Sequence, residues 1–418
     1  MLPLAAALAA AGHEVLFAVP PEVKDIPEAA GLATVALGGH LDPLPAFRTV
    51  AASSPSGRSP APAARGGTPR VLSLFVRLAE DMAGDLVAVA REYRPDLVLH
   101  DPTALAGPVA AAAVGARAVR HLYGLDLLAR ASPMVSRALE PLYRRFGLPA
   151  TGPMTGSATG PMTGSATGPM TGSATGPMTG SATGPMTGSV TGHVTGFGIV
   201  AVDPWPGPAR PGHLPIRHTA YGAGLTPQHA GRGAPSRAQA AAGRRRVCVS
   251  WGHTMARLDG GLHLAGQVAR TVAADPSVEV VLATAPEHRR LLGALPPGVR
   301  VIEDGPLGGV IAGCDALISQ GGAGVSLTAL ALGVPQLMIG GLPDHLAHAR
   351  AVAELGAGRA LTAGEAGDDT LRRELRLLLH TPAYRETAAR LGQEMRARPS
   401  PDEVAAHLAG HRTPHERA

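Results

Sequence analysis

Residues 314–358 read CDALISQGGAGVSLTALALGVPQLMIGGLPDHLAHARAVAELGAG, and the order of elements in this stretch decides the fold. The apolar run 315–319 predicts a short buried strand, and the glycine turn 320–324 follows it. The next apolar residues recur at helical spacing until Gly333 and Pro335 end the pattern. A strand, a tight turn and a helix in this order are typical of an α/β protein with parallel strands.

The glycine turn could bind an anion. Glycine lets the backbone approach a ligand closely, and the free amides and positive end of the following helix favour a diphosphate. A turn of this kind also occurs in ordinary strand-to-helix connections that bind nothing. The next apolar strand, 334–339, leads to Asp344 and His345 at the same edge of the sheet, where open α/β sheets bind ligands. The combination predicts a nucleotide-sugar site.

These motifs resemble the donor-binding half of GT-B glycosyltransferases, specifically the family 1 bacterial antibiotic enzymes that move deoxysugars from dTDP or UDP onto polyketide or macrolide aglycones. The family pattern is a His-Gly-Gly-Ala-Gly-Thr/Ser turn, then Gly-Val-Pro-Gln, then Asp-Gln. In this chain Gln320 replaces the histidine of the turn, and His345 replaces the glutamine of the pair. Val325 stands at the first hydroxyl position, with Ser326 next.

The resemblance implies an α/β protein with two Rossmann-like domains facing a cleft. It implies an inverting transfer, independent of metal and cofactor, from a nucleotide-sugar donor to a small hydrophobic aglycone. An auxiliary activator protein or a second copy of the chain could be a partner. The donor-site residues implied in this way are Gly252, His253, Thr254, Leu307, Gln320, Gly321, Gly322, Ala323, Gly324, Val325, Ser326, Asp344 and His345.

Several of these residues have an expected role. Asp344 can accept two hydrogen bonds from neighbouring sugar hydroxyls, and it could also cap a helix over 345–355. Thr254 is expected to donate a hydroxyl to phosphate or sugar, and His253 is either a cation there or an ordinary loop histidine. By the resemblance, Leu307 falls where the nucleobase packs. Gln320 can donate a hydrogen bond as histidine would, but it carries no charge.

In the N-terminal half, Asp101 ends an apolar strand and matches the aspartate that orients a catalytic histidine in many GT-B enzymes. An alignment of residues 1–5 with the family's Pro-Met-Val-Pro-Leu-Ala places that histidine and the first strand upstream of Met1. We therefore expect the reading frame to extend upstream, and the chain as numbered to lack its base. His100 and His121 are the other candidates for a base, and neither fits the family motif.

Two alternatives remain open at the level of sequence. Gln320, Val325 and the missing base favour a catalytically impaired member of the same fold that serves as an auxiliary partner. A UDP-sugar epimerase of this fold is disfavoured, because residues 122–126 and 215–221 follow the transferase pattern.

With 418 residues the chain exceeds the usual size of one hydrophobic core, which predicts two domains. By the resemblance, we expect an acceptor-binding domain over 1–221, a linker over 222–246 and a nucleotide-sugar-binding domain over 247–418, whose last helix crosses back onto the first domain. Repeats of TGPMTGSA fill most of 151–196, and their composition predicts a disordered insert from recent duplication.

Composition excludes several other classes. The formal charge of +5 is spread over scattered arginines, and the cluster Arg244–Arg246 precedes an apolar strand, so we expect a solvated cluster there and no nucleic-acid partner. Cys248 and Cys314 are expected to be buried and reduced. We expect residues 2–11 to form a helix and not a signal peptide, and no membrane-spanning run is present in the sequence, so a cytoplasmic location is expected.

Overall fold

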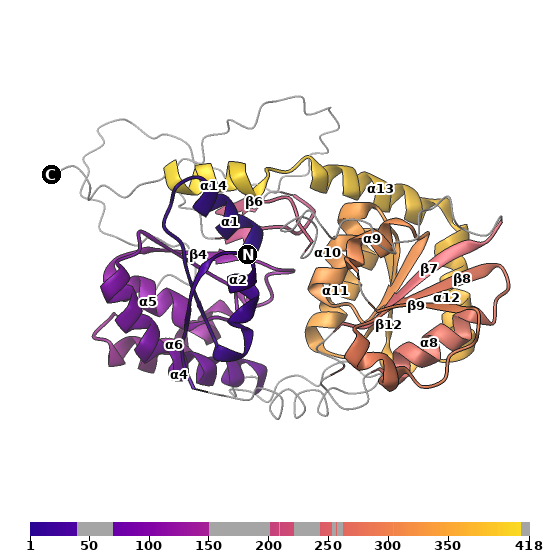
Figure 1. Ribbon diagram of the computed structural model, residues 1–418, viewed down its shortest axis with the longest axis horizontal. Helices are drawn as coiled ribbons and strands as arrows, with labels where there is room; N and C mark the ends of the chain where they lie inside the picture. Colours follow the sequence, from indigo (N-terminus) through magenta and orange to yellow (C-terminus); the bar gives the residue numbers. More distant parts are fainter. Residues whose placement is uncertain are drawn as a thin grey trace, which may run out of the picture.

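The computed structural model describes residues 1–39, 70–149, 201–208, 210–220, 243–252, 256, 262–303 and 305–410. These residues form two α/β domains that lie next to each other (Figure 1). The repeat 151–196, residues 222–242 of the expected linker, and the expected donor-site residues His253 and Thr254 lie outside the described residues.

The C-terminal domain is built on a six-stranded sheet in which every neighbouring pair is parallel. In spatial order the strands are β12 (Gly358–Thr362), β11 (Gln336–Gly340), β10 (Ala316–Ser319), β7 (Arg245–Ser250), β8 (Val278–Ala283) and β9 (Val299–Ile302). The chain forms one half of the sheet with β7, β8 and β9 and then returns to the centre with β10, so the direction of winding reverses between β7 and β10.

Helices cover both faces of this sheet, as the continuous run of buried residues along β7 requires. Val247 and Val249 face a core shared with α8 (His263–Ala273) and α12 (Asp368–His380), whereas Cys248 faces α9 (Leu307–Ala312) and α10 (Ala323–Leu332). The remaining elements of the domain are α11 (Pro343–Glu354), α13 (Pro382–Arg396) and the 3-10 turns η4 (Pro286–Leu292) and η5 (Ala363–Glu365).

The N-terminal domain contains a parallel four-stranded sheet and a separate parallel pair. The strands are β3 (Leu97–His100), β4 (Arg117–His121), β5 (Ala201–Asp203) and β6 (His213–Pro215), with β1 (Leu16–Val19) paired to β2 (Ala33–Ala36). A shared core joins three helices, α4 (Arg70–Tyr93), α5 (Ala106–Val114) and α6 (Ser132–Arg145). The short elements are η1 (Pro21–Val23), α2 (Asp25–Ala29) and η2 (Ala129–Ala131).

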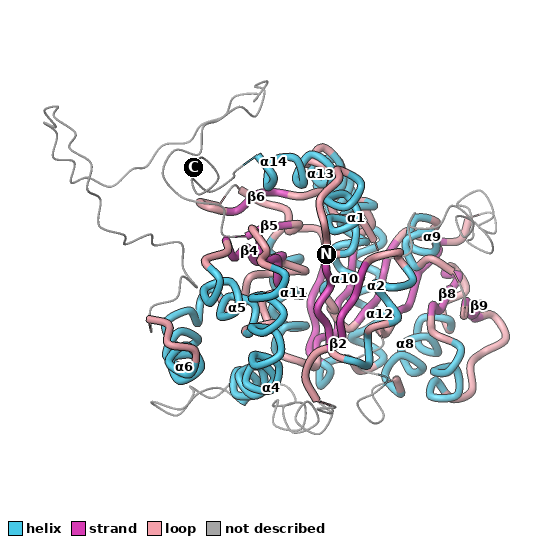
Figure 2. Tube along the Cα trace, turned by 60° about the vertical axis from the view of Figure 1, so that its left-hand side comes forward, coloured by secondary structure: helices cyan, strands magenta, loops and turns pink. Residues whose placement is uncertain are grey.

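The last helix of the chain packs on the N-terminal domain. Figures 1 and 2 show α14 (Pro401–Gly410) following α13 and lying beside α1 (Leu2–Ala10). Val404 and Leu408 share a buried cluster with Leu4, and the Arg117 guanidinium donates to the carbonyl oxygen of Leu408 at 2.6 Å. This helix joins the two domains by a route separate from the linker.

The sheet-and-helix order expected from the sequence is confirmed, and so are the buried cysteines Cys248 and Cys314. Two local predictions were wrong. Arg246 is not solvated: its side chain is 1% exposed and lies opposite Glu279 of β8, with Nη2 3.1 Å from the carboxylate. The helix after β11 begins at Pro343, so Asp344 lies in its first turn and does not cap it.

None of the helices in the described ranges is long and apolar enough to cross a membrane. The cytoplasmic location stays a prediction.

Candidate functional site

The predicted donor turn lies at the point where the winding of the sheet reverses. Ser319 ends β10 beside Ser250, the last residue of β7, and residues 320–322 lead from there into α10. Gly321 has a φ of +91°, and a Cβ atom on it would lie 2.7 Å from the carbonyl oxygen of His345. Only glycine meets both conditions, so the turn packs directly against the start of α11.

The start of α10 presents amides and not hydroxyls. Gly322 is the N-cap and makes no side-chain cap. Ser326 is fully buried and donates its hydroxyl to the carbonyl oxygen of Gly322 at 2.7 Å, while Val325 packs against the core under α9. The groups that can meet a diphosphate here are therefore the backbone amides of residues 322–324.

Gln320 connects the ends of two strands. Its side chain is buried, and its Oε1 atom accepts a hydrogen bond from the amide of Gly252 at 3.1 Å. A Cβ atom on Gly252 would lie 2.8 Å from the Gln320 Nε2 atom, so a residue with a side chain would displace this amide. The expected donor-site residues Gly252 and Gln320 are thus brought together at the ends of β7 and β10.

The structure separates the two polar residues at the start of α11. The Asp344 side chain is 48% exposed, whereas that of His345 is 4% exposed, and His345 Nε2 lies 3.9 Å from the Asp344 carboxylate. Burial lowers the pKa of His345, although the Asp344 charge opposes the shift. Asp344 is therefore accessible to a ligand, and His345 is a buried neutral ring.

Leu307 is the first residue of α9 and is partly buried against the core that contains Cys248 and Ile311. The neighbouring Gly308 lies close to Thr328 of α10 and to Ala220, which follows β6. The start of α9 is thus near α10, on the side of the sheet that faces the other domain.

Asp101 follows β3 and its carboxylate organises the turn after that strand. Oδ1 accepts hydrogen bonds from the amide and hydroxyl of Thr103, at 2.7 and 2.5 Å, and from the amide of Ala104 at 3.2 Å. Among the described residues, no group donates a hydrogen bond to Oδ2.

The two other histidines proposed as a base are buried under helices and strands. His100 is 6% exposed, and burial lowers its pKa to about 4; its Nδ1 atom lies 2.9 Å from the carbonyl oxygen of Asp101. His121 is 9% exposed, and burial lowers its pKa to about 3. Groups with such low pKa values are weak bases at neutral pH.

Tyr123 lies two residues after β4, and charged residues from both domains affect its hydroxyl. Loss of water around its hydroxyl raises its pKa, and the negative charges of Asp101 and Asp344 add to the effect. The hydroxyl also interacts with Thr103, while the residue as a whole is 48% exposed. Tyr123 is therefore within electrostatic range of both Asp101 and Asp344. The position of an aromatic residue just after a strand, in a chain with 3% aromatics, was the available sequence signal.

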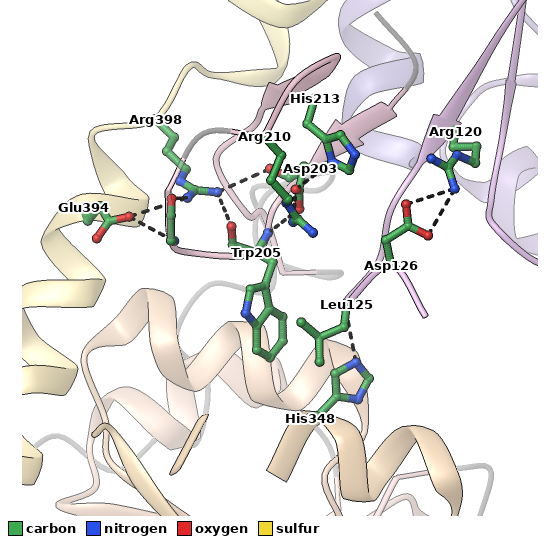
Figure 3. Close-up of polar contacts among 11 residues, drawn as sticks. Arg120, Leu125, Asp126, Asp203, Trp205, Arg210, His213, His348, Glu394 and Arg398 are labelled. Carbon is green, nitrogen blue, oxygen red and sulfur yellow. Dashed lines mark hydrogen bonds and ion pairs between the residues drawn. The ribbon is translucent and has the colours of Figure 1, made fainter. Parts of the chain in front are cut away.

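His348 was not among the expected residues, yet it touches both domains. Figure 3 shows its ring below Leu125 and Trp205. Its Nδ1 atom is 3.1 Å from the carbonyl oxygen of Gly321, and its Nε2 atom is 3.3 Å from the amide of Leu125. The ring stacks on Trp205 with 5.5 Å between centroids. No local pattern identifies such a residue, because its partners are distant in sequence.

Comparison with known proteins identifies the family. Residues 6–150 match the N-terminal domain, and residues 268–410 the C-terminal domain, of proteins described as erythromycin biosynthesis protein CIII-like. The chain belongs to this family of glycosyltransferases. It is 30% identical to the L-demethylnoviosyl transferase of Streptomyces niveus, over 98% of this chain and 93% of that protein. It is 31% identical to the aklavinone 7-beta-L-rhodosaminyltransferase of Streptomyces galilaeus, over 96% and 90%.

Solved structures give the same result for the fold. The spinosyn rhamnosyltransferase SpnG, crystallised with thymidine diphosphate and with spinosyn aglycone, aligns with a TM-score of 0.70 and 26% identity, over 98% of this chain and 95% of that one. The GT-B resemblance inferred from residues 320–345 is confirmed. This EryCIII-like glycosyltransferase belongs to the class that transfers dTDP-deoxysugars to polyketide and macrolide aglycones.

Proposed function

We propose that this chain transfers a deoxysugar from its dTDP conjugate to a hydroxyl of a hydrophobic polyketide aglycone bound between the two domains. The observation that carries the proposal is the position of Asp344 and Asp101. The negative charges of both carboxylates raise the pKa of Tyr123, although one belongs to the start of α11 and the other follows β3. A donor held by the C-terminal domain and an acceptor held by the N-terminal domain would meet there.

On the donor side, the amides of residues 322–324 would bind the diphosphate and stabilise its charge as it leaves. By the resemblance, this binding would need no metal ion. Leu307 would contact the nucleobase, as the resemblance implies. The exposed carboxylate of Asp344 would accept hydrogen bonds from the sugar hydroxyls. Gln320 would support the turn through Gly252, while His253 and Thr254, outside the described residues, keep their expected roles.

On the acceptor side, inversion requires a base that removes the proton from the attacking hydroxyl. Oδ2 of Asp101, with no donor among the described residues, would accept a hydrogen bond from the histidine that the resemblance predicts. That histidine would take the proton. The Tyr123 hydroxyl is protonated at neutral pH, as tyrosine ordinarily is, and its raised pKa extends this state to more alkaline solution. It would donate to the acceptor or the sugar.

An auxiliary role without catalysis is the second candidate. It is favoured by Gln320, whose amide oxygen is occupied by Gly252 and whose side chain carries no charge. Membership in the EryCIII-like family favours transfer over epimerisation. Only the transferase role predicts that a glycosylated product forms.

A transfer assay tests the proposal. The purified protein is incubated with dTDP-L-rhamnose or another dTDP-deoxysugar and with aklavinone or 10-deoxymethynolide, and the products are analysed by mass spectrometry. We expect a product with the mass of the aglycone plus one sugar from a form of the protein that carries the predicted histidine, and we expect Asp101→Asn to remove it. Tight dTDP binding without product from any donor and acceptor pair, with or without a partner protein, would favour the auxiliary role.

A further inference from the structure

His348 is hydrogen-bonded through both ring nitrogens, and the two partners fix its state. The ring is 1% exposed. The carbonyl oxygen of Gly321 can only accept, so Nδ1 carries the proton, and the amide of Leu125 can only donate, so Nε2 is the acceptor. His348 is therefore a neutral ring with a single tautomer that is held between the donor turn and the N-terminal domain.

The hydrogen bond between His348 and the Gly321 carbonyl sets the direction of the Gly322 amide. In a planar trans peptide the carbonyl and the following N–H point in opposite directions. Because the Gly321 carbonyl points to His348, the amide of Gly322 points away from α11. Within the described residues this amide has no hydrogen-bond partner. His348 thus aims the first free amide of the turn outward, where the proposed diphosphate would lie.

The contact with Leu125 places a loop of the N-terminal domain. A Cβ atom on Gly124 would lie 2.6 Å from His348 Nε2 and 2.9 Å from the Cβ atom of Ala323, so the loop touches both α11 and the first residue of α10. The loop also carries Tyr123. Its far end is held by the buried ion pair of Arg120 and Asp126, with Nη1 2.9 Å from the carboxylate (Figure 3).

The third contact fixes the ring plane. Trp205 follows β5 of the N-terminal domain, but its indole packs into the C-terminal core formed with Leu327, Met338 and Val352. Its carbonyl oxygen accepts a hydrogen bond from Arg398 Nη1 at 2.7 Å, so the indole is held by the segment between α13 and α14 (Figure 3).

We propose that His348 is a positioning residue that couples the donor turn to the loop carrying Tyr123, so that the diphosphate-binding amide and the acceptor-side hydroxyl are set by one imidazole ring. The proposal rests on the proposed binding of the donor at this turn. It assigns His348 no contact with the substrate. The two nitrogens have separate effects. Nδ1 affects nucleotide binding through Gly321, and Nε2 affects the transfer step through Leu125.

Two substitutions of His348 divide these effects. In His348→Asn the side-chain amide takes the place of Nδ1, so the link to Gly321 is kept and the link to Leu125 is lost. In His348→Gln the side-chain oxygen reaches the place of Nε2. The link to Leu125 is then kept and the link to Gly321 is lost. We expect His348→Asn to keep the Kd for dTDP within about threefold and to lower kcat about tenfold, whereas His348→Gln should raise the Kd about tenfold.

Two further variants complete the experiment. Gly124→Ala displaces the loop while His348 is intact, and it should lower kcat with little change in the Kd for dTDP. His380→Gln, an exposed histidine on α12, is the matched control and should change neither value. The thermal midpoint of each variant is measured first, and Gly124→Ala decides the question if a His348 variant does not fold.

The outcomes separate the two proposals. Opposite changes in Kd and kcat for the Asn and Gln variants support the coupling. If the wild-type protein binds dTDP and both variants keep the two parameters within threefold, or lose both to the same degree, the coupling is wrong. If the wild-type protein fails to bind dTDP, the proposed function fails, and the coupling fails with it.

Discussion

The side-chain oxygen of Gln320 accepts a hydrogen bond from the amide of Gly252 at 3.1 Å, and this bond joins the ends of β10 and β7. These two strands flank the reversal of winding in the C-terminal sheet, where α/β proteins bind their ligands. Gln320 therefore stabilises the donor site through its Oε1 atom, which holds the amide of Gly252 in place.

A change of charge at Gln320 should reduce nucleotide binding without unfolding the domain. Gln320→Glu keeps an oxygen for the Gly252 amide but places a negative charge beside the proposed diphosphate. We expect the Kd for dTDP to rise at least tenfold, with a smaller effect at high ionic strength. Calorimetric titration at two salt concentrations measures both. An unchanged Kd would place the diphosphate away from this turn.

Gly321→Ala should destabilise the C-terminal domain. The substitution introduces a side chain at a φ of +91° and a Cβ atom 2.7 Å from the His345 carbonyl oxygen, so we expect a loss of about 2 kcal/mol. Gly324→Ala is the control, because a Cβ atom there has open space and ordinary helical geometry. Thermal unfolding of both variants decides the matter, and equal midpoints would show that the turn is not constrained as described.

Asp344→Ala should distinguish a sugar contact from a structural role. If the exposed carboxylate binds sugar hydroxyls, the variant weakens a dTDP-sugar about tenfold and leaves free dTDP nearly unchanged. The two ligands are compared by calorimetry on the same protein preparation. Equal weakening of both, together with a lower thermal midpoint, would instead indicate that Asp344 mainly stabilises the start of α11.

Acid should destabilise the fold through His100. Burial lowers its pKa from 6.5 to about 4, so below pH 6.5 the unfolded chain binds a proton that the folded protein does not. This contribution is complete above pH 6.5 and is lost as the pH falls to about 4, with a total of up to about 3 kcal/mol. His100→Asn keeps a donor for the Asp101 carbonyl and removes the titration. Its thermal midpoint should fall less between pH 7 and pH 5, and an equal fall would refute the assignment.

The motifs that follow parallel strands could be predicted from the sequence because their chemistry is local. The turn 320–324, the strand before it and the helix after it follow from glycine placement and apolar periodicity. The start of α11 was misjudged by two residues, since proline at the first helical position is itself a start signal and places Asp344 inside the helix.

Residues defined by distant partners could not be predicted in this way. Arg246 is buried because β7 is central in the sheet and Glu279 lies opposite it on β8, a pairing that only the register reveals. His348 is recognised only when Leu125 and Trp205, from another domain, are placed against it. The sequence near each residue carries no trace of these contacts.

The central claim is that this EryCIII-like glycosyltransferase binds a dTDP-sugar at the turn that starts α10. Calorimetric titration of the wild-type chain with dTDP and with UDP tests it most directly. The account predicts saturable binding of dTDP, with a Kd that rises at least tenfold in Gln320→Glu. Absence of measurable binding of either nucleotide at millimolar concentration would contradict it.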